Sequence, residues 1–310
     1  MPFFSVIIPT YNRLHYLMEA LESVRQQAFT DYEVIVVDDG STDGTQTALL
    51  EMLKSGNAEK LKLKYVRQEN AGPGAARNLG ARNAQGEYLA FLDSDDVWLP
   101  WTLEVYRQAI DFGDGAAFVS GRGEEIDRKA SFTSKADFQR FSCMLGACTG
   151  TILPVGGTPS VAVKRMSFET SGGFPSIRIN AEDMDLWFRL GMEPGFVKIE
   201  NPTVFQQRYH SANVSLDMRA AVGGVQFLFS QEAAGSFPGG TMFEKHRKRI
   251  LAASARATSL DCLRAGECVN ALKLFSLTFS EQLRQGRWKY LLAFFPILLV
   301  KSMLILHRKV

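Results

Sequence analysis

An alternation of short apolar runs with amphipathic stretches over the first 112 residues restricts this chain to few folds. Runs of β-branched, aliphatic and aromatic residues predict buried strands at residues 5–8, 34–37, 63–66 and 88–92. Apolar residues at helical spacing predict a helix after each strand, the last over residues 100–112. Buried parallel strands joined by helices have this pattern. We therefore predict an α/β fold, with a mostly parallel sheet and helices on both faces.

Polar clusters stand directly after three of the predicted strands. They are Thr10-Tyr11-Asn12, Asp38-Asp39 and Asp93-Ser94-Asp95-Asp96. The carboxyl ends of parallel strands lie along one edge of a sheet, and open α/β sheets bind their ligands there. The three clusters together predict a ligand site at this edge. Asp96 is expected to cap the helix that begins near Pro100.

The pattern changes beyond residue 115. It is irregular from residue 120 to 147, which suggests a lid or an acceptor-facing loop, before a strand at 161–163 and a helix at 183–190. Two further helices, over 243–265 and 267–283, are typical of an αα-hairpin. We expect one domain over residues 1–217, with halves of about 1–115 and 116–217, and a helical extension over 218–310.

Charge is distributed unevenly along the chain. The whole sequence has a formal net charge of +2, but residues 241–310 hold 13 basic and 4 acidic residues. An acidic body with a basic tail predicts two regions with different partners, and the near-neutral total disfavours a nucleic-acid binder. The four cysteines have neither the number nor the spacing of a disulfide framework or a zinc site, which is typical of a cytosolic protein.

Asp93 and Asp95 form a candidate metal site. Two carboxylates at positions i and i+2 after a strand can converge on one hard cation. Oxygen ligands suit Mg²⁺ or Mn²⁺, which bridge substrate phosphates. On these residues alone, a solvated turn or a helix cap is the alternative.

Two other strand or loop ends carry candidate nucleotide ligands. The Asp39 carboxylate can accept the imide N–H of uracil or a donor of another base, although an Asx-turn is the alternative. Arg77, after the loop Gly72-Pro73-Gly74, can pair with phosphate or a base. This loop departs from the dinucleotide fingerprint at Arg77 and in its place along the chain, so we exclude a nicotinamide enzyme. No P-loop motif is present either.

Glu182 and Asp183 open a predicted helix. One of them can serve as a general base. The alternative is that acidic residues in a first turn merely interact favourably with the helix dipole.

Five successive blocks between Phe4 and about Ser215 resemble a known family. They resemble the successive sequence signatures of glycosyltransferase family two, and they occur in the same order. Members of that family are inverting enzymes with the GT-A fold. The blocks are Ser5–Asn12, Val36–Asp43, Asn70–Asn78, Gly86–Asp96 and Glu182–Trp187.

The resemblance implies a nucleotide site in the half formed by residues 1–115. Thr10 and Tyr11 would frame the base, with Tyr11 packing on its face, and Asp39 would bind the base edge. Arg77 would help to hold the nucleotide. Asp93 would touch the ribose or the metal.

The resemblance also implies a metal site and a base. Asp95, with Asp93, would bind the Mn²⁺ or Mg²⁺ that bridges the diphosphate, and Asp183 would be the catalytic base. His210 resembles a histidine that in many members closes over the diphosphate or metal; a plain surface or core histidine is the alternative. One base without a carboxylate nucleophile implies a single displacement with inversion.

Taken together, the sequence is interpreted as a metal-dependent inverting glycosyltransferase. It would move a sugar from a nucleotide-diphosphate donor, with a UDP-sugar favoured, to a glycan or lipid-linked acceptor in cell-envelope or surface polysaccharide synthesis. Residues 116–217 would form the acceptor half. The alternative is a catalytically inactive nucleotide-sugar-binding or scaffold protein on the same fold. A sugar nucleotidyltransferase is disfavoured, because its N-terminal glycine-rich phosphate loop is missing.

The C-terminal segment from Trp288 to Leu306 is apolar and has basic residues at both ends. Its uninterrupted run, Tyr290–Val300, is shorter than the ~20 residues that span a bilayer. We expect a helix that lies in the plane of an anionic membrane surface, kinked at Pro296. A core helix packed on the αα-hairpin is the alternative. The protein would then be cytoplasmic and peripheral on the inner face of the cell membrane.

Overall fold

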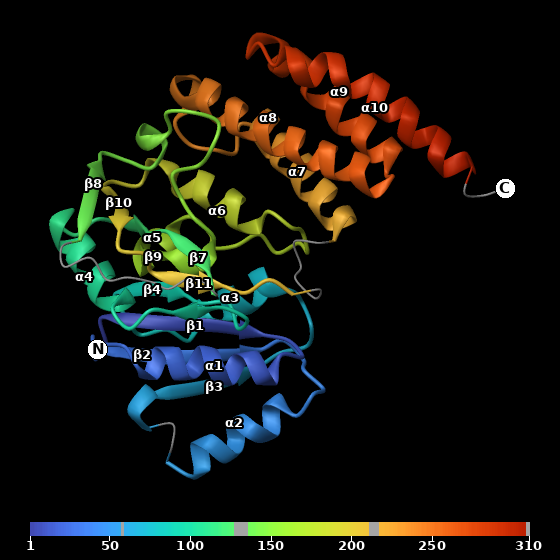
Figure 1. Cartoon of the computed structure of the whole chain (residues 1–310). Coiled ribbons are helices and arrows are strands. Elements are labelled where there is room, and N and C mark those ends of the chain that lie inside the picture. Colours follow the sequence, from blue (N-terminus) through green and yellow to red (C-terminus); the bar gives the residue numbers. More distant parts are fainter. Residues whose placement is uncertain (57–58, 127–135, 211–216, 308–310) are drawn as a thin grey trace. The chain divides into compact units, whose positions relative to one another are not determined.

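The computed structural model describes residues 1–56, 59–126, 136–210 and 217–307. The chain forms two compact units (Figure 1). Unit 1 comprises Met1–Ala147, Pro154–Arg178 and Glu182–His210, and unit 2 comprises Cys148–Leu153, Ile179–Ala181 and Ser211–Val310.

Unit 1 contains every strand of the described residues. They are β1 Phe4–Thr10, β2 Tyr32–Asp38, β3 Leu63–Arg67, β4 Tyr88–Phe91, β5 Val97–Trp98, β6 Phe118–Ser120, β7 Gly123–Glu125, β8 Asp137–Phe141, β9 Val161–Lys164, β10 Phe196–Asn201 and β11 Phe205–Gln207. Its α-helices are α1 Leu14–Arg25, α2 Thr45–Lys54, α3 Pro73–Arg82, α4 Thr102–Phe112, α5 Arg165–Thr170 and α6 Glu182–Arg189. The order of strands and helices up to α4 confirms the predicted alternation, apart from the short strand β5.

Eight strands form the main sheet, in the order β3-β2-β1-β4-β9-β6-β10-β8. The first four are parallel neighbours, as predicted. β9 runs antiparallel to both β4 and β6, and β8 runs antiparallel to β10. The second half of the sheet is therefore mixed, and it is built from the part of the sequence where strands and helices do not alternate regularly.

Helices cover both faces of the parallel half. Successive side chains of a strand point to opposite faces. Ile8 of β1 packs in one core with Leu17 of α1 and Tyr106 of α4. Val37 of β2 packs on the opposite face with Ala76 of α3. This two-sided burial explains why these strands read as continuous apolar runs.

A second, three-stranded sheet has the order β5-β11-β7. β11 pairs antiparallel with β5, where Phe205 lies opposite Trp98, and parallel with β7. β5 starts directly after Asp96, and β11 continues into Arg208. The central strand of this sheet thus brings a late segment of unit 1 beside the aspartates that follow β4.

Unit 2 is helical. Its helices are α7 Met218–Ala233, α8 Gly240–Ala265, α9 Cys268–Arg284 and α10 Trp288–His307. The predicted helical extension is therefore present, with α7 as an additional helix. Its core includes Leu274 and Phe275 of α9 and Tyr290 and Phe294 of α10. The rings of Phe275 and Phe294 are stacked with their centroids 4.0 Å apart.

α10 has one packed and one exposed apolar face. Tyr290 and Phe294 are buried, whereas Leu292 is 74% exposed and Leu299 is 59% exposed. α10 continues through Pro296 as one helix and packs on α9. No helix of the described residues has both the length and the apolar character needed to cross a membrane.

Candidate active site

The loops after β1 and β2 are joined at the carboxyl edge of the sheet. The Asp39 amide donates to the Thr10 carbonyl at 2.8 Å, and the Asn12 amide donates to Ser41 Oγ at 2.9 Å. Thr10 is buried, and its Oγ1 has no hydrogen-bond partner among the described residues. Tyr11 is 45% exposed. Its ring is therefore accessible to a planar ligand such as a base.

The Asp39 carboxylate already binds three donors. It accepts hydrogen bonds from Gln68 Nε2 at 2.7 Å and from the amides of Ala71 and Gly72, both at 2.8 Å. Asp39 therefore orders the loop that precedes α3. Because a carboxylate has about four lone-pair sites, it retains capacity for one donor of a ligand. The neighbouring Asp38 is fully buried and bonded within the fold.

Arg77 of α3 links the end of β4 to the start of α6. Its guanidinium donates to Asp93 Oδ1 at 2.6 Å and to Glu182 Oε1 at 3.1 Å, and it lies over the ring of Phe174. Burial opposes the charge, but Asp93 and Glu182 outweigh it and raise the pKa of Arg77. The geometry makes Arg77 an anchor for these two carboxylates.

Asp183 lies in the first turn of α6. Burial, and then repulsion from Glu182, raise the pKa of Asp183 to about 6, although its own carboxylate accepts the Met184 amide at 2.7 Å. A carboxylate with a pKa of this size can accept a proton near neutral pH. The arrangement thus makes Asp183 a candidate general base, and Arg77 ties the preceding residue, Glu182, to Asp93.

Asp95 and His210 come together, as the sequence implied for the metal site. His210 Nε2 lies 3.1 Å from Asp95 Oδ2, and its ring stacks on Tyr16 with the centroids 5.0 Å apart. The same carboxylate oxygen forms an ion pair with Arg13. Asp93 is instead paired with Arg77. The residues that follow His210 in the sequence, 211–216, lie outside the described residues.

The side chains of Asp95 and His210 fit a cation that is bound jointly by the protein and a substrate. Across the residues that the structure describes, no three metal-binding side chains converge. Mg²⁺ and Mn²⁺ sites of phosphoryl substrates usually need only one or two protein ligands, since phosphates and waters complete the shell. Asp95 and His210 would provide an oxygen and an imidazole ligand to such a cation. A cation there would replace Arg13 on the Asp95 oxygen.

Arg208, which follows β11, is a site residue that the sequence did not indicate. Its amide donates to Asp96 Oδ1 at 3.0 Å, its Nε donates to the Asp95 carbonyl at 3.2 Å, and its guanidinium pairs with Glu19. It also lies over the ring of Tyr16. No local signal marks it, because its partners at 95 and 96 are more than a hundred positions away. Arg13 was more accessible to prediction, since it directly follows the block that ends at Asn12.

The predicted role of Asp96 as a helix cap is wrong. α4 begins only at Thr102, and the buried Asp96 carboxylate accepts the Arg208 amide instead. Burial, together with the nearby Asp93, raises the pKa of Asp96 to about 8.

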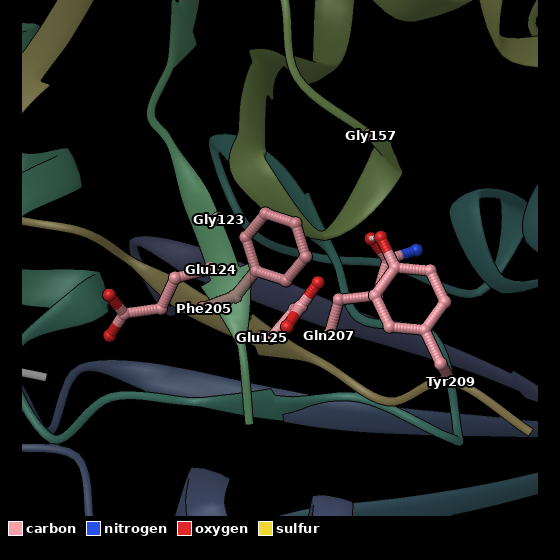
Figure 2. Close-up of a pocket in the computed structure, with 7 residues that line it drawn as sticks. All are labelled: Gly123, Glu124, Glu125, Gly157, Phe205, Gln207 and Tyr209. Carbon is pink, nitrogen blue, oxygen red and sulfur yellow. Dashed lines mark hydrogen bonds between the residues drawn. The ribbon is translucent and has the colours of Figure 1, made fainter. Parts of the chain in front are cut away.

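A cavity of about 360 Å³ opens at the three-stranded sheet. Figure 2 shows the rings of Phe205 and Tyr209 with the Glu125 carboxylate between them, while Glu124 points away. Tyr209 Oη and Gln207 Oε1 are 3.2 Å apart. Aromatic faces beside a carboxylate and an amide suit a polyhydroxylated ligand. β7 contributes to the cavity from within the segment 120–147 that was expected to face an acceptor.

The sequence model of the family described as "Glycosyl transferase family 2" matches residues 5–169. An uncharacterized glycosyltransferase of Rickettsia felis is 45% identical over 191 residues, which cover 60% of this chain and 30% of that protein. An uncharacterized glycosyltransferase of Haemophilus influenzae is 31% identical over 65% of this chain and 67% of its own length. The putative teichuronic acid biosynthesis glycosyltransferase TuaG of Bacillus subtilis is 44% identical over 33% of this chain and 40% of its own.

The chain spans only 26 to 30% of the length of three Rickettsia relatives. Among solved structures, S. aureus TarS 1-349 in complex with UDP-GlcNAc is similar with a TM-score of 0.64 and 20% identity, over 92% of both chains. The mannosyltransferase PcManGT from Pyrobaculum calidifontis, in complex with GDP-Man and Mn²⁺, has a TM-score of 0.57 and 22% identity, over 97% of this chain and 87% of its own. At these identities the likeness shows the GT-A fold.

Proposed function

The chain belongs to glycosyl transferase family 2, and from this we propose a metal-dependent, inverting transfer of a sugar from a UDP-sugar to a glycan or lipid-linked acceptor. The observation that carries the proposal is that two sets of contacts meet in the loop after β4: Asp95 lies against His210, and Asp93 is paired with Arg77, which also binds Glu182 beside Asp183. These residues include the proposed ligands of the nucleotide diphosphate and of the cation, and the proposed general base, Asp183. We assign catalysis to residues 1–217, with the nucleotide half over about 1–115 and the acceptor half over about 116–217.

The nucleotide is proposed to lie against the loops after β1 and β2. Tyr11 stacks on the base, and the remaining lone pair of Asp39 accepts a base N–H, beside the buried hydroxyl of Thr10. Uracil fits this role because its imide is a donor. The TarS structure with UDP-GlcNAc supports the choice of UDP by analogy of fold.

Asp95, His210 and Asp93 are proposed to hold Mn²⁺ or Mg²⁺. When bound, the cation neutralises charge on the departing diphosphate. Arg13 and Arg208 contact the same carboxylate loop, so they keep Asp95 and Asp96 in place before the donor arrives.

Asp183 is proposed to remove the proton of the acceptor hydroxyl. The freed oxygen attacks the anomeric carbon from the face opposite the diphosphate, so the configuration inverts in a single displacement. Near neutral pH this carboxylate is mostly ionised, because its pKa is about 6. Arg77 orients the first turn of α6 through Glu182 and thereby fixes the direction from which Asp183 acts.

The acceptor is proposed to bind at the cavity between β7 and β11. Tyr209 and Phe205 offer ring faces to a sugar, and Glu125 accepts hydrogen bonds from its hydroxyls. The neighbouring His210 belongs to the proposed metal site, so a sugar in this cavity lies beside the diphosphate. The similarity to TuaG supports a role in cell-envelope polysaccharide synthesis.

A peripheral position on the inner face of the cell membrane is part of the proposal. The exposed apolar face of α10 would lie in the surface of an anionic leaflet, while Tyr290 and Phe294 keep the helix attached to unit 2. A lipid-linked acceptor is presented at such a surface.

Hydrolysis of UDP-sugars, measured with and without Mn²⁺, tests the proposal. We expect slow hydrolysis that requires the cation and that Asp95→Ala abolishes. The alternative is a catalytically inactive nucleotide-sugar-binding or scaffold protein on this fold. It would bind UDP-sugars, but it would neither hydrolyse nor transfer them with Mn²⁺ or Mg²⁺. The enzyme is favoured because a scaffold needs no base with a raised pKa.

A further inference from the structure

Two arginines, one from α8 and one from the turn between α9 and α10, contact Gln282 near the end of α9. Arg256 of α8 donates from Nη1 to Gln282 Oε1 at 3.0 Å, and the Arg287 amide donates to the Gln282 carbonyl at 3.0 Å. The Nε of Arg287 is buried without a hydrogen-bond partner among the described residues. Both arginines are therefore fixed at Gln282, one by its side chain and the other by its backbone.

No carboxylate among the described residues forms an ion pair with either arginine. Glu281, in the last turn of α9, is paired with Arg284 and accepts a hydrogen bond from Gln285. Burial, and then the charge of Arg287, lower the pKa of Arg256. Two like charges held together without a counter-ion cost the fold stability. The cost is offset when an anion binds between them.

The surroundings of the pair are those of a membrane interface. Trp288 is 57% exposed, and a Cβ placed on Gly286 would lie 3.8 Å from its indole nitrogen, so the ring folds back over the turn. Leu283 is also exposed. The exposed apolar face of α10 continues away from this turn through Leu292 and Leu299. Tryptophan favours the headgroup level of a bilayer, with apolar side chains below it.

We propose that Arg256 and Arg287 bind the phosphate of an anionic phospholipid at the α9–α10 turn, with Trp288 at the headgroup level and the exposed face of α10 in the acyl boundary. The site deepens the peripheral membrane position proposed above and rests on it. Guanidinium groups bind phosphate oxygens through paired, charge-assisted hydrogen bonds. The basic residues of the turn and the apolar helix complement the two parts of one lipid, and a soluble anion would leave the apolar face in water.

The test measures binding of the full chain to vesicles of phosphatidylcholine with and without phosphatidylglycerol, at constant ionic strength. Arg287→Gln is the main variant, because the substitution removes no side-chain hydrogen bond or ion pair with any residue that the structure describes. Arg256→Gln is the second variant. Lys273→Gln, on the exposed surface of α9, is the matched control, since it removes the same charge from unit 2.

We expect Arg287→Gln to weaken binding to the anionic vesicles more than about tenfold, as for the loss of hydrogen bonds to a charged group. Lys273→Gln should weaken it by about fivefold at most, the effect of one charge near the surface. Arg287→Gln should also melt at the same or a higher temperature than the parent chain, because it relieves repulsion from Arg256.

Four results would overturn the site. Equal effects of Arg287→Gln and Lys273→Gln would leave only general attraction to the membrane. If Arg287→Gln lost binding and also melted at a clearly lower temperature, Arg287 would have a structural role. In that case Arg256→Gln decides: the site stands only if this variant loses binding while its melting temperature is unchanged. Stabilisation of the chain by inorganic phosphate without vesicle binding would make the ligand a soluble anion. Failure of the parent chain to bind any vesicle would remove the membrane position itself, while hydrolysis of UDP-sugars would still test the proposed enzyme.

Discussion

Replacement of Arg77 by glutamine should destabilise unit 1 strongly. The Arg77 side chain is 5% exposed and neutralises two carboxylates, of which Asp93 is 28% and Glu182 is 13% exposed. Removing one partner of a buried ion pair costs about 3–5 kcal/mol, because the remaining charge is left uncompensated. The partial exposure of Asp93 lets water screen it, so we expect a loss near the lower end, about 3 kcal/mol.

Urea unfolding followed by circular dichroism measures this loss. Arg140→Gln is the control, since its ion pair with Asp114 is exposed, with side chains 48% and 77% accessible. Such a surface pair contributes at most about 1 kcal/mol. The triple variant Arg77→Met, Asp93→Asn, Glu182→Gln should recover more than half of the loss, because it removes the uncompensated charges. A cost for Arg77→Gln no larger than that of Arg140→Gln would refute the reasoning, as would a triple variant that is no more stable than the single one.

Further predictions concern the site and the tail. Asp95→Ala should lose UDP binding that depends on Mn²⁺, measured by calorimetry, while thermal melting stays cooperative; retained Mn²⁺-dependent affinity would contradict the metal assignment. Asp183→Asn should retain UDP binding but lose transfer. Because the folded pKa of Asp183 is raised to about 6, its ionisation reduces stability as pH rises through 4 to 6. Asp183→Asn should therefore have a higher melting temperature than the parent at pH 7.5. The rate of transfer by the parent should decrease as the pH falls below about 6. If Asp183→Asn kept some activity and its rate decreased in the same way at low pH, Asp183 would be excluded as the base. Leu292→Ser with Leu299→Ser should reduce vesicle binding with little change in melting temperature, and an unchanged affinity would argue against insertion of α10.

The parallel half of the fold was predictable because its strands are buried on both faces. Continuous apolar runs such as Val34–Val37 leave little doubt about strands, and the polar clusters follow from where those strands end. The three-stranded sheet was not predictable in the same way. β5 and β11 are only two and three residues long, which is too short for a periodic signal, and their pairing joins distant parts of the sequence.

The candidate site shows the same division. Asp95 and Asp183 lie in local motifs, so the sequence alone marks them as candidates. Arg208 could not, because its role depends on the register of β11 beside β5. The tail was ambiguous for a different reason. One apolar face of α10 packs in the core of unit 2 and another is exposed. Composition alone does not show that Phe294 is buried and Leu292 exposed.

The pairing of β11 with β5 has a consequence for biosynthesis. A ribosome releases residues 1–112 early, and these residues include the four parallel strands β1 to β4 and the helices that connect them. Asp95 and Asp96 nevertheless acquire Arg208 and His210 only after more than a hundred further residues have been synthesised. A nascent chain that ends before β11 is therefore expected to form its parallel sheet but not to bind a nucleotide diphosphate through a cation. Pulse-labelled chains stalled at residue 200 and at residue 240 should differ in retention on a UDP resin with Mn²⁺, with only the longer chain retained.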